Sequence, residues 1–597
     1  MEQPAEQTSP APDEIAPIGR VVSVTGSQAV VLLNEDVAGP EKAAEGAELG
    51  MVLTVGTTRT VLLGVVSALS VPVPSQREAE SEVRIAELEL VGELSKARKE
   101  FVRGVSVYPT LGELVFRATT QELELAYLWN SPSAVRLGSL RQDRSIPAMI
   151  DVNELLGKHF AVVGSTGTGK SCGVALILRM ILEKNPKGHI LLLDPHNEYA
   201  TSFGDSAEVI TPKNLQLPFW FLTFEEMVEV LMHGQKAREA EIEILSELIL
   251  LAKASYAANR DRAPNHFVRR RGDDFGGFTV DTPVPYRISD VVAFIDERMG
   301  RLENRKDLTP YRQLKTRIET ISQDPRYQFM FGNLTIQDRM TEILGRLFRV
   351  PVNGKPIAIL ELTGVPADVV NVVVSVICRM SFDFALWSDG RVPLTLVCEE
   401  AHRYVPNDPK LGFDPTRRAI ARIAKEGRKY GVSLAVISQR PAELDPTILS
   451  QCSTIFAMRL SNERDQDIVR AAIADSVASL LDFLPSMGTR EAVVFGDGVT
   501  LPQRMRFDDL DQDVMPRSRT ARFTERWREG EGDTAFLEDV VDHWRAAGAM
   551  APLNPAQTGP IPAGGQPAPP VAVERRAETN GAAAPARPAP APTNTPR

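Results

Sequence analysis

Cysteine is scarce and scattered along this chain. The 597 residues include Cys172, Cys378, Cys398 and Cys452, with no CxxC pair and no histidine at metal-ligand spacing. That pattern argues against a disulfide framework and against a structural zinc site. A reducing compartment, the cytoplasm, is therefore expected.

The chain also lacks a targeting signal, a membrane-length apolar run and an excess of positive charge. Residues 1–14 are acidic and proline-rich, unlike a signal peptide. No stretch approaches the apolar length of a membrane span, so direct membrane insertion is not expected. The formal net charge of −11 argues against a basic surface, but leaves a basic channel for nucleic acid possible.

What the chain does have is the composition of a soluble globular protein. It is 43% hydrophobic and 24% charged, which is enough to bury substantial cores. Its length predicts a large central domain with one or two smaller ones. Residues 551–597 are dominated by proline, alanine, glycine and threonine and bury too little apolar surface to fold. This tail and residues 1–14 are expected to be disordered.

Apolar patterns divide the rest of the chain. Short apolar runs broken by turn residues predict a small β-barrel at 15–120, and the looser pattern at 121–150 is interpreted as a connector. Strands and helices then alternate over 151–515, which indicates an α/β fold with a parallel sheet. Helical spacing at about 224–330 predicts an α-helical insertion, and 516–550 is expected to be a C-terminal helical segment.

The clearest motif is GSTGTGKS, which lies between an apolar strand and an apolar helix and matches the P-loop pattern in full. Glycines let backbone N–H groups approach phosphate oxygens, Lys170 reaches the terminal phosphates of ATP, and Ser171 offers a hydroxyl to Mg²⁺. A glycine-rich turn without a ligand would not require the Lys-Ser pair. The residues expected to cradle ATP are Gly164, Ser165, Thr166, Gly167, Thr168, Gly169, Lys170 and Ser171.

Two adjacent carboxylates end a later apolar strand, PLTLVCEEAH. Beside a P-loop, one acid usually organises the water shell of Mg²⁺ and the next activates the attacking water. We assign the metal role to Glu399 and the general-base role to Glu400; two solvated glutamates are the alternative. Gln439 ends the next strand, SLAVISQRP, and is expected to sense the γ-phosphate or to orient the water.

Two further positions have both a functional and a structural interpretation. Arg428 precedes the Gln439 strand, so it lies away from the phosphate end of its own sheet and could complete a neighbour's site. It could equally complement a helix dipole. Asp194 ends the strand after the P-loop helix, at the ligand-bearing edge, but could also cap a turn. His196 and His402 lie near the same edge and are given no chemical role.

Taken together, these motifs resemble those of the HerA family. After the P-loop come LLLDPHNEY, CEEAHRYVP, EGRKYG and ISQRPAELDPTILSQCSTIFAMRL, in matching order across roughly 157–460. The segment beginning IGRVVSVTG resembles the small barrel that the family shares with rotary ATP-synthase subunits. The resemblance implies a RecA-like P-loop NTPase core with an N-terminal β-barrel. It also implies a homo-hexamer that hydrolyses ATP at subunit interfaces and moves double-stranded DNA, as a translocase or helicase.

The resemblance carries residue roles as well. It implies that Arg428 acts in trans, and that a basic residue before the P-loop strand contacts a neighbour's nucleotide. Lys158 is the candidate, although lysine stands where arginine is expected and lacks the planar fork. Glu399 replaces a common aspartate but remains an oxygen ligand for magnesium-bound water. The residues implied to act within one subunit are Lys170, Ser171, Glu399, Glu400 and Gln439.

The segment after the paired glutamates is basic within an acidic chain. Between Ala401 and Arg440, nine lysines and arginines face three acidic residues. A loop following the catalytic strand of a RecA-like ring can project into the pore, where basic side chains contact the DNA backbone. A solvated basic face is the alternative. The candidates for DNA contact are Arg403, Lys410, Arg417 and Arg418.

Several functions are compatible with these motifs. The family commonly drives DNA-end resection in repair with a NurA-like nuclease, and related rings in anti-phage defence work with nuclease or sirtuin-like effectors. One alternative is an ATP-binding hexameric scaffold that assembles and gates an effector. Another is a DNA pump of a conjugation or segregation system. Nothing in the chain resembles a nuclease active site, so DNA cutting is expected from a partner.

Overall fold

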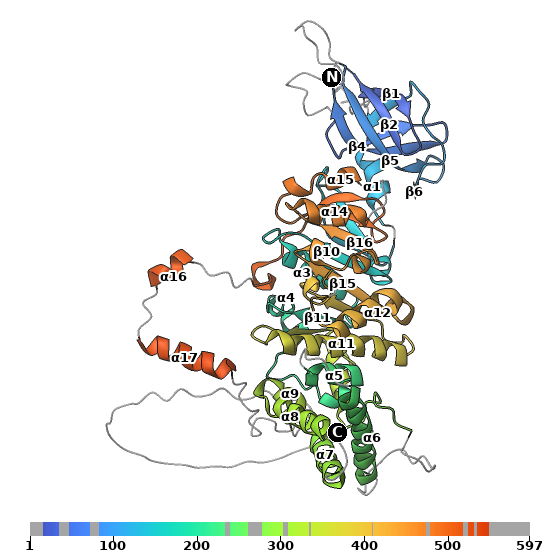
Figure 1. Ribbon diagram of the computed structural model, residues 1–597. Helices are drawn as coiled ribbons and strands as arrows, with labels where there is room; N and C mark the ends of the chain where they lie inside the picture. The colour runs from blue at the N-terminus through green and yellow to red at the C-terminus, as the bar shows by residue number, and fades with distance from the viewer. Residues whose placement is uncertain are drawn as a thin grey trace, which may run out of the picture. The chain divides into compact units, whose positions relative to one another are not determined.

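A computed structural model describes most of the chain, with elements labelled in Figure 1. The described residues are 16–34, 47–71, 83–129, 131–232, 239–260, 277–302, 308–332, 336–408, 410–472, 478–517, 523–529 and 534–548. The terminal ranges predicted to be disordered, 1–14 and 551–597, lie outside them.

The N-terminal strands form a closed antiparallel barrel. They pair in the order β2-β1-β7-β3-β4-β5-β6, and β2 also pairs with β5, which closes six of the strands into a ring (Figure 1). Because alternate side chains of a strand face one side, every second residue fills the barrel, as Leu53, Val55 and Leu88 do. The strands are β1 (Gly19–Val24), β2 (Gln28–Leu33), β3 (Val52–Gly56), β4 (Thr60–Ser70), β5 (Ile85–Ser95), β6 (Phe101–Arg103) and β7 (Leu114–Arg117).

A second sheet of eleven strands forms the central domain. Its parallel part has the order β12-β13-β11-β14-β15-β10-β16, and β17, β18, β8 and β9 extend it in antiparallel fashion. The parallel strands are β10 (His159–Val163), β11 (Ile190–Asp194), β12 (Ala207–Ile210), β13 (Ile357–Glu361), β14 (Leu394–Cys398), β15 (Val432–Ser438) and β16 (Cys452–Ala457). The antiparallel strands are β8 (Ala134–Leu140), β9 (Pro147–Asp151), β17 (Glu491–Gly496) and β18 (Gln503–Phe507).

The range 121–150 differs from the connector that the sequence predicts. After α1 (Thr120–Tyr127) it contains β8 and β9, which belong to the central sheet. Strand β8 carries an exposed Arg136 and an irregular register before Gly138, so its apolar alternation is interrupted. Gly138 is required because a Cβ there would lie 2.0 Å from the Arg506 carbonyl oxygen of β18. Because of these interruptions, the alternation of apolar and polar residues did not predict β8 and β9.

Helices cover the central sheet. One of them, α11, is long and apolar enough to cross a membrane, contrary to the sequence-based expectation, but 72% of its apolar window is buried inside the fold. It packs against α12 and is a core helix. The helices outside the insertion are α2 (Val152–Leu156), α3 (Lys170–Lys184), α4 (Ala200–Phe203), α11 (Ala367–Trp387), α12 (Asp414–Tyr430), α13 (Pro446–Leu449), α14 (Glu463–Ala471), α15 (Ala478–Leu481), α16 (Phe523–Glu529) and α17 (Thr534–Gly548).

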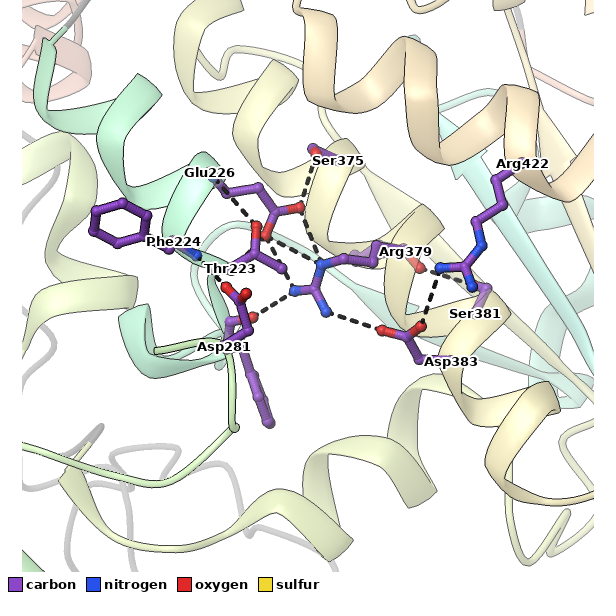
Figure 2. Close-up of polar contacts among 11 residues, drawn as sticks. Thr223, Phe224, Glu226, Asp281, Ser375, Arg379, Ser381, Asp383 and Arg422 are labelled. Atoms are coloured by element: carbon purple, nitrogen blue, oxygen red, sulfur yellow. Dashed lines mark hydrogen bonds and ion pairs between the residues drawn. The ribbon is translucent and has the colours of Figure 1, made fainter. Parts of the chain in front are cut away.

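The helical insertion is anchored on α11 by a buried ion pair. The Arg379 guanidinium of α11 lies 3.1 Å from Glu226 Oε2 of α5 and 3.2 Å from Asp383 (Figure 2). The Ser375 hydroxyl also donates to Glu226, at 2.9 Å. Truncating one partner would leave a buried charge unpaired. The insertion comprises α5 (Phe224–Met232), α6 (Glu239–Arg260), α7 (Ile288–Leu302), α8 (Thr309–Gln323), α9 (Gln328–Phe331) and α10 (Met340–Leu347).

The predicted fold class is confirmed. An α/β core with a parallel sheet carries a P-loop after β10, a small β-barrel precedes it, and an α-helical insertion separates β12 from β13.

Candidate nucleotide-binding and catalytic site

Three parallel strands bring the sequence motifs to one edge of the central sheet. Strand β15 lies between the P-loop strand β10 and the glutamate-bearing strand β14, with Val163 opposite Ser438 and Cys398 opposite Val436. The carboxyl ends of parallel strands share an edge, which is where open α/β sheets bind ligands. The P-loop, the paired glutamates and Gln439 therefore meet in space.

The P-loop has the backbone of a phosphate cradle. Gly167 and Gly169 adopt φ angles of +77° and +90°, a region that favours glycine. The Thr168 hydroxyl donates to the Ser165 carbonyl at 2.9 Å and holds the loop in shape. Helix α3 begins directly after Gly169, which has no side chain to cap it. Its first N–H groups are thus available to an anion, as the sequence predicts.

Lys170 and Glu399 form a buried pair beside this cradle. Lys170 Nζ lies 3.7 Å from Glu399 Oε1, and both side chains are almost fully buried. Burial, with a smaller contribution from neighbouring carboxylates, raises the pKa of Glu399 to about 8, against the opposing influence of Lys170. Within the described part of the chain, Glu399 Oε2 has no hydrogen-bond partner. An unpaired, buried carboxylate oxygen close to the P-loop is suited to bind a Mg²⁺ ion or a water molecule of its shell.

Glu400 is oriented by a chain of side chains that starts at the P-loop. The Thr166 hydroxyl donates to Gln439 Oε1 at 2.6 Å, and Gln439 Nε2 donates to Glu400 Oε1. Glu400 itself has a φ of +52°, a left-handed conformation that is uncommon for a residue other than glycine. Such backbone outliers gather at functional sites. Gln439 thus connects the phosphate cradle to the predicted general base.

Two histidines that the sequence left without a role also contact Glu400. His402 Nδ1 lies 3.3 Å from Glu400 Oε2, and His196 Nε2 lies 3.9 Å from Glu400 Oε1. Burial lowers the pKa of His402, although the Glu400 carboxylate opposes that effect. Both histidines, Glu400 and Gln439 line one cavity of about 740 Å³ at the edge of the sheet. A single histidine has no motif from which its role can be predicted, so the contacts of His196 and His402 with Glu400 are visible only in the structure.

Asp194, expected among the nucleotide-binding residues, is used by its own turn. Its carboxylate is fully buried and accepts the backbone N–H groups of His196 at 3.3 Å and Tyr199 at 3.0 Å. Burial raises its pKa. Asp194 therefore caps its own turn, which is the structural alternative that the sequence left open. The carboxylate of this turn that reaches the P-loop is Glu198, which accepts a hydrogen bond from the Ser171 hydroxyl at 2.7 Å. Sequence analysis missed it.

Lys158 and Arg428 lie at the opposite, amino edge of the same strands. Lys158 directly precedes β10, and its Nζ lies 2.6 Å from Asp497 and 3.4 Å from Glu154, contacts that raise its pKa. Arg428 is exposed in the last turn of α12, next to the start of β15. Neither belongs to the catalytic edge of its own subunit.

Comparison with known proteins agrees with the motifs. The family model described as "Helicase HerA, central domain" matches residues 135–381. The DNA double-strand break repair helicase HerA of Pyrococcus furiosus is 26% identical over 444 residues, which span 66% of this chain and 72% of the relative. The corresponding protein of Sulfolobus acidocaldarius is 25% identical over 441 residues, or 73% of this chain and 80% of the relative. The chain therefore resembles HerA helicases through its central domain.

The chain is a P-loop ATPase, because a complete P-loop follows β10 and the relatives that it matches are HerA helicases. Among solved structures, VirB4 of Thermoanaerobacter pseudethanolicus is 14% identical, covers 65% of this chain and 99% of its own, and has a TM-score of 0.45. The bacterial conjugative coupling protein TrwB is 13% identical over 65% of this chain and 96% of its own, with a TM-score of 0.41.

The basic candidates for DNA contact differ in the acidic partners that they have. Arg417 pairs with Asp414 at 2.7 Å, and Arg418 pairs with Glu225 at 2.5 Å and with Asp414 at 2.8 Å. Arg403 and Lys410 are exposed, and Arg403 lines the cavity beside Glu400. Arg422 stacks on Phe382. Its guanidinium also lies 3.9 Å from Asp383 (Figure 2). The local excess of positive charge is therefore partly neutralised.

We predict that Gln439→Ala lowers kcat for ATP hydrolysis by about 10²-fold, because Glu400 loses its connection to the P-loop and a displaced catalytic group has an effect of this size. Nucleotide affinity is expected to stay close to that of the wild type. Steady-state ATPase assays and binding of a fluorescent ATP analogue measure the two quantities. Gln451→Ala, at an exposed glutamine, is the control. Unchanged kcat, or an equal loss of affinity, would contradict the role given to Gln439.

Proposed function

We propose that this chain is an ATP-driven translocase of double-stranded DNA that works as a homo-hexameric ring and hydrolyses ATP between subunits. One observation carries the proposal. The phosphate cradle, Glu400 and Gln439 occupy the carboxyl edge of the sheet, whereas Arg428 and Lys158 occupy the amino edge. A site completed by both edges requires two subunits.

Within one subunit, different side chains bind the phosphates and activate the attacking water. Lys170 and the P-loop N–H groups bind the phosphates, and Glu400, held by Gln439, accepts the proton of the attacking water as its oxygen bonds to the γ-phosphorus. Ser171 and Glu399 would hold a Mg²⁺ ion, which would supply positive charge to the phosphate oxygens. The bond between the γ-phosphorus and the β–γ bridging oxygen breaks, and that oxygen keeps the electron pair as part of ADP. The products are inorganic phosphate and ADP bound at the P-loop.

The arginine of a neighbouring subunit would complete this site. Arg428 is exposed on the last turn of α12, and its guanidinium carries the planar set of donors suited to phosphate oxygens. Arginines supplied in trans stabilise charge in phosphoryl transfer. Lys158 is the second candidate at this edge. Its ion pairs with Asp497 and Glu154 would have to be exchanged for contact with a nucleotide.

The trans arrangement predicts complementation between inactive subunits. Arg428→Ala and Glu400→Gln should each lack ATPase activity, and mixed rings should recover part of it, because some interfaces pair an intact arginine with an intact glutamate. Subunit exchange is verified first by mass measurement of differently tagged rings. If verified mixed rings show no recovery while Arg428→Ala alone keeps full activity, the trans role is wrong.

Double-stranded DNA is the proposed substrate that the ring moves. The named relatives are DNA repair helicases, and the segment after Glu400 offers basic groups for backbone contact. Arg403 is the best placed, because its backbone N–H donates to the Glu400 carbonyl at 2.9 Å within the same turn. A phosphate contact at Arg403 could therefore be transmitted to the general base through one turn of the chain.

We predict that Arg403→Ala and Lys410→Ala each weaken DNA binding for all sequences alike, and each lower the slope of log affinity against log salt by about one. Arg417→Ala and Arg418→Ala should have smaller effects, because acidic partners already neutralise them. Fluorescence anisotropy with labelled duplexes over a salt series measures both slopes. Equal effects of all four variants would indicate a diffuse basic face instead.

The pathway and partner follow from the family by analogy. We propose that the ring acts in the cytoplasm in DNA-end processing or anti-phage defence, together with a NurA-like nuclease or a nuclease or sirtuin-like effector. The relatives of Pyrococcus furiosus and Sulfolobus acidocaldarius are named for double-strand break repair, which supports the first of these. Purification of the ring from native cells, followed by mass spectrometry, identifies the partner.

A further inference from the structure

The turn after β11 is a rigid support for one carboxylate. Asp194 accepts two backbone N–H groups from within the turn, as described above. On its outer side, the Asn197 side chain accepts the Thr363 N–H at 3.3 Å, and the Thr363 hydroxyl donates to the Pro195 carbonyl at 2.9 Å. Asn197 itself has a φ of +53°. These contacts fix the backbone that leads into Glu198.

Glu198 and Glu399 have different partners at the P-loop. The Ser171 hydroxyl donates to Glu198 Oε2 at 2.7 Å. Glu399, the glutamate of the paired strand, faces Lys170 and keeps one buried oxygen without a partner in the described part of the chain. Glu198 is thus the acceptor of the Ser171 proton. The unpaired Oε2 atom of Glu399 is available to a cation.

A serine hydroxyl that ligates a metal uses an oxygen lone pair and keeps its proton, so the proton needs an acceptor. An acceptor carboxylate orients the ligand and makes it more basic, and such outer contacts affect metal affinity strongly. We propose that Glu198 is a positioning residue that holds the Ser171 hydroxyl with its lone pair toward Mg²⁺. This inference rests on the proposed use of Mg²⁺ with the nucleotide.

The test measures the affinity of the full-length protein for a fluorescent ADP with Mg²⁺ and with EDTA. In Glu198→Ala, the gain in affinity caused by Mg²⁺ should fall by about tenfold, while affinity in EDTA is kept. Glu198→Gln should keep most of the gain, because its amide oxygen still accepts the Ser171 proton. Asp205→Ala, an exposed carboxylate beyond the turn, is the control and should match the wild type.

Other outcomes overturn the inference. Equal losses in Glu198→Ala and Glu198→Gln would mean that negative charge alone attracts the metal. Loss of affinity in EDTA as well would indicate a structural role. A larger gain from Mg²⁺ in Glu198→Ala would show that Glu198 competes with the metal for Ser171.

A double-mutant cycle isolates the proposed route. In a Ser171→Ala background, adding Glu198→Ala should change the gain from Mg²⁺ by less than about twofold, because both side chains act through one hydroxyl. A further tenfold loss would mean that Glu198 acts independently of Ser171. If the wild type itself shows no gain from Mg²⁺, the proposed cofactor is wrong; a wild-type gain unaffected by Glu198→Ala refutes only the role of Glu198.

Discussion

The parallel pairing of β10, β15 and β14 is the constraint on which the site depends. Because β15 separates the other two strands, Gln439 follows a strand that lies between the P-loop and the paired glutamates. Its amide can therefore contact Thr166 on one side and Glu400 on the other. A shift of register would break this chain and leave Glu400 without its link to the phosphate cradle. Catalytic geometry here is a consequence of sheet topology.

The same pairing separates two sets of charged groups. Groups that follow the strands gather at the P-loop, the proposed nucleotide site, and groups that precede them, such as Arg428, lie at the opposite edge of the sheet. A ring in which the amino edge of one subunit meets the carboxyl edge of the next would join the two sets. Ion pairs such as those of Arg417 and Arg418 keep part of the basic segment engaged within the subunit. Of the four candidates, Arg403 and Lys410 are exposed and have no ion pair within the described part of the chain.

How much of this could be predicted from the sequence depended on how local each signal is. The P-loop and the Glu-Glu pair are contiguous motifs whose chemistry requires their residue types, and the barrel and core follow from apolar periodicity. Asp194 and Glu198 belong to one short turn, and only side-chain directions reveal that the first caps the turn while the second reaches Ser171. His402 and the interrupted strand β8 likewise carry no distinctive pattern. The roles of these residues depend on contacts between segments that are distant in the sequence.

We propose that Glu400, and not Glu399, activates the attacking water. Retention of radiolabelled ATP after rapid desalting in the presence of Mg²⁺ tests it most directly. Glu400→Gln should bind ATP as the wild type does and hold it unhydrolysed, since the phosphate and cation groups remain, whereas Lys170→Ala should retain little nucleotide. Conversion of bound ATP to ADP by Glu400→Gln at a rate near that of the wild type would contradict the account.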